Sequence, residues 1–128
     1  MRKELDNKLC TDFPLLYRDR HGDKRSTLMC WGFPGDGWYD LIYRLSAKLE
    51  PLIAAMSGEQ REWCRAVQVK EKFGTLRFYM SSETDEMAAL ICEAESESAR
   101  TCEHCGAPGV LRDGGWLLTL CDVCQAAR

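Results

Sequence analysis

The stretch CEHCGAPGVLRDGGWLLTLCDVC, residues 102–124, decides the fold of the C-terminal part of this chain. It begins with Cys102 and Cys105 and ends with Cys121 and Cys124, so two C-x₂-C pairs stand fifteen residues apart. Two residues between cysteines let one tight turn aim both sulfurs at a single cation, and this spacing is typical of a four-cysteine zinc site. Four thiolates fill a tetrahedron, so we predict one structural Zn²⁺ without an open position for catalysis.

The residues between the two cysteine pairs predict a small β-hairpin. Residues 110–112 and 116–120 are strand-like, and residues 113–115 (Asp-Gly-Gly) are typical of the turn between two strands. Gly106 directly follows the first cysteine pair and suits the tight turn there. Residues 101–128 are therefore expected to form a zinc ribbon, which the metal holds together.

The preceding hundred residues predict a small domain of helices and one hairpin. Two alternating runs around a glycine-containing turn indicate a β-hairpin at about 66–80, with Val67 and Val69 facing the core. Apolar residues recur at helical spacing before it, over about 37–56, where Asp36 is a candidate N-cap. The fold class predicted is α+β, with a domain over residues 1–100 and a zinc ribbon over residues 101–128.

A further helix is expected at about 84–99, running directly into the cysteine module. Its apolar stripe includes Met87 and Ile91, and Cys92 beside this stripe is expected to be a core residue. The opposite face is expected to be solvated because it carries Glu93, Glu95 and Glu97. This acidic stretch follows a basic one, since residues 61–80 contain five basic and two acidic residues.

The composition is that of a folded globular protein. Of 128 residues, 45% are hydrophobic and 29% charged, which excludes a disordered tail and a coiled coil. No apolar run approaches the roughly 18 residues of a membrane span. Residues 1–6 lack an apolar run after their basic side chains, so we expect no export signal and no membrane partner. Eight cysteines without an export signal favour reduced or metal-bound thiols in the cytoplasm.

The sequence predicts no enzyme. Its two histidines, His21 and His104, are too few for a nuclease whose metal is held by histidines, and no Walker-type phosphate loop is present. Cys10, His21 and Cys30 are candidates for a second metal site, but the favoured interpretation is that they bind none.

Two surfaces are candidates for binding a partner. The first is an aromatic loop at residues 31–39, where a core role competes with a binding role, more strongly for Trp38 than for Phe33. The second is the basic hairpin, whose aromatic tip is typical of nucleic-acid contacts, although the acidic helix could neutralise it. The candidate partner-binding residues on these surfaces are Trp31, Phe33, Lys70, Lys72, Phe73 and Arg77.

Several motifs resemble a family of small proteins encoded by tailed bacteriophages and prophages. They are VKEKFGTLRFY at residues 69–79, TCEHCG at 101–106 and GWLLTLC at 115–121. The resemblance implies the cytoplasm of a bacterial host and an accessory role in infection. We therefore expect a non-enzymatic protein that binds a host or phage protein, as an inhibitor of a bacterial defence system similar to anti-CRISPR proteins. The alternative is a nucleic-acid-binding regulator that uses the basic hairpin and the ribbon.

Overall fold

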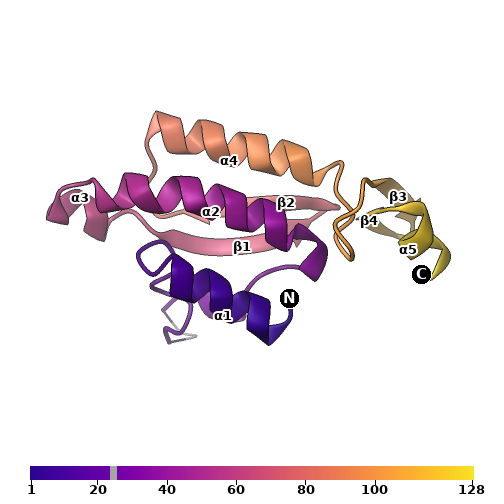
Figure 1. Ribbon diagram of the computed structural model, residues 1–128, viewed down its shortest axis with the longest axis horizontal. Helices are drawn as coiled ribbons and strands as arrows, with labels where there is room; N and C mark the ends of the chain where they lie inside the picture. The colour runs from indigo at the N-terminus through magenta and orange to yellow at the C-terminus, as the bar shows by residue number, and fades with distance from the viewer. Residues whose placement is uncertain (24–25) are drawn as a thin grey trace.

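Two antiparallel two-stranded sheets and the helices around them make up the described part of the protein (Figure 1), so the predicted α+β class is confirmed. The computed structural model describes residues 1–23 and 26–128. In chain order the elements are α1 (Lys3–Asp12), the 3₁₀ helices η1 (Leu28–Trp31) and η2 (Asp36–Trp38), α2 (Tyr39–Ala54), α3 (Gly58–Glu62), β1 (Ala66–Lys72), β2 (Thr75–Met80), α4 (Asp85–Ser98), β3 (Val110–Gly114), β4 (Trp116–Leu120) and α5 (Asp122–Ala126).

Helix α2 is the central core helix predicted at residues 37–56. Its apolar side chains recur at helical spacing and are buried, as the pattern predicts: Leu41, Ile42, Leu45, Leu49 and Ile53. Pro51 lies in the last turn and does not end the helix, which continues to Ala54. The prediction that Asp36 caps this helix is wrong. Its carboxylate instead pairs with Nε of Arg2 at 2.9 Å, and the N-cap of η2 is Gly35.

Strands β1 and β2 form the predicted hairpin around a two-residue turn. Phe73 and Gly74 both have positive φ, 55° and 81°, as the type I′ turn between twisted strands requires. The register places Val69 opposite Phe78, and both are buried. A bulge between Ala66 and Gln68 shifts the alternation, so Ala66 is buried with Val69. The predicted core position of Val67 is therefore wrong, and its side chain is only half-buried.

Helix α4 packs along the outer edge of β2 and satisfies backbone groups there. Ser98 Oγ accepts from the N–H of Leu76 at 2.9 Å, and Glu95 Oε2 accepts from the N–H of Phe78 at 2.9 Å. Glu97 pairs with Arg44 of α2 at 2.6 Å. Of the three glutamates predicted to be solvated, Glu93 is exposed. The prediction is wrong for the other two, because they face neighbouring elements.

Cys92 is a second correction on α4. Its side chain is exposed, although the sequence predicts a core residue. The buried stripe consists of Met87, Ile91 and Ala94. Residue 92 lies about 100° further round the helix than residue 91, which is enough to carry it out of a narrow stripe.

An ion pair fastens the N-terminal segment to the core. Asp6 on α1 is 8% exposed, and its carboxylate accepts from Nε and Nη2 of Arg20 at 2.7–3.2 Å. The same guanidinium donates to the carbonyl of Cys30 at 2.9 Å. One arginine thus holds α1 and the chain at Cys30 together.

Candidate metal centre and adjoining groove

The four predicted zinc ligands lie together at the C-terminal end of the molecule. The Sγ atoms of Cys102, Cys105, Cys121 and Cys124 all lie within 4.8 Å of one another, and all four cysteines are free thiols. The Sγ atoms of Cys105 and Cys121 are 3.6 Å apart. Sulfurs on a tetrahedron with metal–sulfur bonds of about 2.3 Å stand about 3.8 Å apart. The cluster therefore has the size that a single tetrahedral cation requires.

Local turns built from each C-x₂-C pair bring the sulfurs together. After the first pair, Gly106 adopts φ 82° and donates its N–H to the carbonyl of Cys102 at 2.9 Å. After the second, the N–H of Cys124 points at the Sγ of Cys121 at 3.4 Å, where α5 begins. The predicted hairpin of β3 and β4 joins the two turns, with Gly115 at its tip.

Backbone N–H groups prepare one cysteine to carry negative charge. Burial disfavours the Cys102 thiolate, but N–H groups from Cys121, Cys105 and His104 outweigh burial and lower the pKa of Cys102 to about 6. The neighbouring thiols act in the opposite sense on Cys124 and raise its pKa to about 12. Four crowded thiols thus share little negative charge by themselves, and a divalent cation is the group that would let all four ionise.

A glycine-rich loop of the N-terminal part packs directly on the first cysteine turn. Gly37 donates its N–H to the carbonyl of Glu103 at 3.0 Å, and a Cβ on Gly37 would lie 2.1 Å from the carbonyl oxygen of Cys102. The buried indole of Trp38 donates Nε1–H to the carbonyl of Thr101 at 2.9 Å. Glycine at position 37 is therefore required by close backbone contact.

The hairpin tip contacts the ribbon at a second place. Thr119 Oγ1 on β4 donates to the carbonyl of Gly74 at 2.6 Å, and a Cβ on Gly74 would lie 2.6 Å from the side chain of Leu111. These contacts hold the tip of one hairpin against the other hairpin. The boundary predicted at residue 100 stays a prediction.

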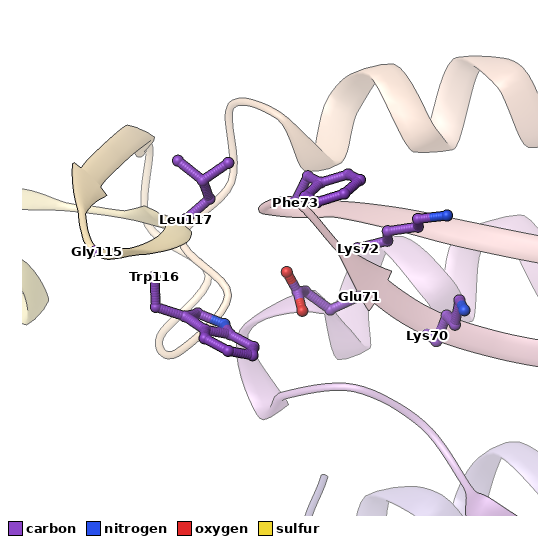
Figure 2. Close-up of a pocket in the computed structure, with 7 residues that line it drawn as sticks. All are labelled: Lys70, Glu71, Lys72, Phe73, Gly115, Trp116 and Leu117. Carbon is purple, nitrogen blue, oxygen red and sulfur yellow. The ribbon is translucent and has the colours of Figure 1, made fainter.

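Exposed aromatic side chains border the space between the two hairpins. Two adjoining pockets share Lys70, Glu71 and Trp116, and we call them together the aromatic groove. One, of about 430 Å³, lies between Phe73 and Trp116, and Figure 2 shows the carboxylate of Glu71 and the indole of Trp116 directed into this region. The other, of about 350 Å³, extends from Trp116 to Trp31. Trp31, Phe73 and Trp116 are 70%, 65% and 71% exposed.

The structure distributes the predicted partner-binding residues between the groove and its surroundings. Trp31, Phe73, Lys70 and Lys72 line the groove with exposed or partly exposed side chains. Phe33 also lines the groove, but its ring is buried and packs edge-on against Tyr17, with 4.9 Å between the ring centroids, as a core residue does. Arg77 lies directly opposite Lys70 in the strand register and therefore shares its face of the hairpin.

Sequence reasoning missed three groove residues: Trp116, Glu71 and Glu103. Trp116 belongs to a strand-like run of the ribbon, where an aromatic residue predicts packing as readily as exposure. Glu103 lies between two metal ligands and is 7% exposed, and burial raises the pKa of its carboxyl. The residues that surround Glu103 in the groove come from distant parts of the sequence, so no local pattern indicated that they lie together.

The remaining candidate ligands do not gather. In the described part of the chain, the four-cysteine cluster is the one group of side chains placed to hold a metal. Cys10 contacts the carboxylate of Asp6, and burial raises the pKa of the Cys10 thiol to about 11. Cys30 donates to the carbonyl of Thr27. His104 is exposed beside the cluster.

Comparison of this chain with protein-family models, curated proteins and solved structures gave no match. Among the helices of the described residues, none has the length and apolar character that crossing a membrane demands. Function is therefore inferred from the residues themselves.

Proposed function

We propose that this protein is a non-enzymatic interaction protein in which one structural Zn²⁺ positions a surface for binding another protein. The metal ligands are Cys102, Cys105, Cys121 and Cys124. The partner is a host or phage protein in the bacterial cytoplasm, and the family resemblance supports inhibition of a bacterial defence system as the role.

The donor set supports a structural role for the metal. All four positions of a zinc tetrahedron are filled by thiolates, so no position is left for a reacting water. The ribbon buries little apolar surface besides its cysteines: its buried cluster consists of Cys102, Leu120 and Cys121. A module with so small a core depends on metal binding for its folding free energy.

The conformation of Phe73 carries the proposal that the groove binds a partner. Phe73 occupies the first turn position, where φ is 55° and asparagine or glycine is favoured. A bulky residue costs stability there, and this ring is also 65% exposed. Lys72 lies over the ring at 5.6 Å, but the ring is not part of the core. Strain and exposure together favour a functional contact over a structural one.

The neighbouring side chains support a protein as the partner. Two exposed tryptophans, Trp31 and Trp116, stand on the same groove as Phe73, and aromatic residues dominate the binding energy of protein interfaces. Glu71 and Glu103 line the groove between them. Carboxylates at this place repel phosphate, so a nucleic-acid backbone fits the groove poorly.

One observation favours the alternative, a nucleic-acid-binding regulator. Lys70 and Arg77 stand directly opposite each other, and Lys72 lies on the same face. Like charges in opposed positions destabilise a hairpin, so this basic face is suited to a negatively charged partner. Lys70, Lys72 and Arg77 make no ion pair closer than 4.0 Å with any described residue.

An affinity pulldown from bacterial lysate, with and without nuclease, tests the proposal. A stoichiometric protein that survives nuclease and is lost with the Phe73→Asn variant is expected. Phe73→Asn keeps the turn, because asparagine tolerates positive φ, so loss of binding does not reflect unfolding. Partners that vanish with nuclease, and whose binding falls steeply with added salt, would instead establish the nucleic-acid function.

A further inference from the structure

The outer edge of β1 presents backbone groups that no other strand of the described residues covers. In the β1–β2 ladder, Leu76 and Phe78 direct their N–H groups outward, to Ser98 and Glu95 of α4. Two residues directly opposite each other in an antiparallel ladder either both direct their N–H and C=O groups toward each other or both direct them away from the partner strand. Glu71 lies opposite Leu76 and Val69 opposite Phe78, so the backbone groups of Glu71 and Val69 point away from β2.

The same edge is covered at its beginning and borders the aromatic groove further along, where Glu71 is partly exposed and Val69 is buried. The N–H of Ala66 donates to the carbonyl of Leu16 at 2.9 Å, as it would to a third strand. Within residues 1–23 and 26–128, the N–H groups of Val69 and Glu71 have no acceptor. Both residues line the 350 Å³ pocket of the aromatic groove. The residues that carry these unpaired N–H groups therefore line a pocket that Trp31 and Trp116 also line.

Charges differ between the two faces of this edge. Glu71 shares the face of Val69, since side chains alternate along a strand, and the buried carboxylate of Glu103 lines the same pocket. One oxygen of each carboxylate accepts a backbone N–H, Gly74 at 2.8 Å for Glu71 and Thr119 at 3.4 Å for Glu103. Neither forms an ion pair with a described residue. The opposite face carries Lys70 and Lys72.

We propose that β1 accepts an extended segment of the partner protein as a third strand, with a basic side chain placed at Glu71 and Glu103 and acidic side chains on either side of it. Side chains of the added strand alternate between faces, so its central residue meets the two glutamates while its neighbours lie beside Lys70 and Lys72. Main-chain bonds to Val69 and Glu71 supply affinity, and the charge pattern supplies specificity. This inference rests on the proposed protein-binding function and names the chemistry of the partner.

A short synthetic strand tests the inference on the zinc-loaded full-length protein. The probe is a capped seven-residue peptide of threonine and valine with a central Glu-Arg-Glu, and its matched control carries Arg-Glu-Arg. NMR amide exchange at Glu71 is expected to be fast in the free protein and slowed by the probe. Three cross-strand charge pairs are reversed in the control, so its affinity is expected to be about tenfold or more weaker.

Variants of the protein distinguish strand addition from other modes of binding. Glu71→Gln and Glu103→Gln are each expected to lower the affinity for the probe about two- to fivefold. Glu93→Gln, on the exposed face of α4, is expected to leave this affinity unchanged. A probe N-methylated at the amide facing β1 is expected to lose binding. Equal binding of the charge-swapped peptide, no binding at millimolar probe, or unchanged amide exchange at Glu71 would overturn the inference.

The proposed function can survive that failure. A partner captured from lysate whose binding needs Phe73 and Trp116 but is indifferent to Glu71→Gln and Glu103→Gln would keep the protein-binding function and refute strand addition.

Discussion

Replacing Gly37 by alanine tests whether the two parts of the chain are held together by backbone contact. The Cβ of Gly37→Ala would lie 2.1 Å from the carbonyl oxygen of Cys102, 2.6 Å from the carbonyl carbon of Glu103 and 2.8 Å from the amide nitrogen of Cys105. All three are main-chain atoms of the first cysteine turn, so no flexible side chain can move aside. The loop and the turn must separate by about 1.3 Å, from 2.1 Å to 3.4 Å, to reach an ordinary contact distance.

The cost of that separation has two parts. Overpacking of this kind costs about 1–3 kcal/mol. The hydrogen bonds from Gly37 N–H to Glu103 and from Trp38 Nε1–H to Thr101 add about 1 kcal/mol each when broken. The total is about 3–5 kcal/mol, which lowers the Tm of a chain this size by roughly 10–20 °C.

Thermal unfolding of the zinc-loaded protein, followed by circular dichroism, measures this change. Gly58→Ala is the matched control, because a Cβ there meets nothing within 4 Å and the residue lies in α3. The control is expected to be neutral or stabilising by up to about 1 kcal/mol. If Gly37→Ala melted within about 2 °C of the unmodified protein, the close contact between loop and cysteine turn would not exist in solution.

Four other perturbations probe the metal site, a buried ion pair and the strained turn. Cys124→Ser is expected to abolish stoichiometric zinc binding and unfold the ribbon, seen as loss of NMR dispersion for residues 101–128 while the β1–β2 hairpin signals remain. Zinc affinity is expected to fall on acidification, because each thiol must lose its proton to bind the metal; competition with a chelator at a series of pH values measures this fall, and an affinity that does not change with pH would contradict thiolate ligation. Arg20→Ala leaves the buried carboxylate of Asp6 without its cation and is expected to cost about 2–4 kcal/mol in denaturant unfolding, an effect that Asp6→Asn with Arg20→Met should partly reverse. Phe73→Asn is expected to stabilise the protein by about 1 kcal/mol in the same assay while it weakens partner binding; a destabilised variant would contradict the strain at this turn.

The elements with local patterns were predictable from the sequence. The two C-x₂-C pairs require tight turns, and the residues between them alternate around glycines, so the ribbon hairpin follows from neighbours in sequence. The apolar residues of the β1–β2 hairpin and of α4 also recur with the period of a strand or a helix within one short segment of sequence. Helix α2 was predicted well because its buried residues lie on one face that faces the core throughout.

Features that depend on distant residues were not predictable. Gly35 and Gly37 admit the backbone of residues 102–105, a contact between segments far apart in the sequence that no local pattern indicates. The bulge in β1 changes which residues are buried, and no pattern in the neighbouring sequence indicates that a bulge forms there. The groove joins Trp31, Glu71 and Trp116 from three separate segments, and only the folded arrangement brings them together.

The metal content of the protein tests the central claim most directly. Elemental analysis of protein purified without chelator, combined with X-ray absorption at the zinc edge, gives both stoichiometry and ligands. We predict one zinc per chain bound to four sulfurs at about 2.3 Å. Less than about half an equivalent of zinc, or nitrogen or oxygen atoms among its ligands, would contradict the assignment of Cys102, Cys105, Cys121 and Cys124 as a closed structural site.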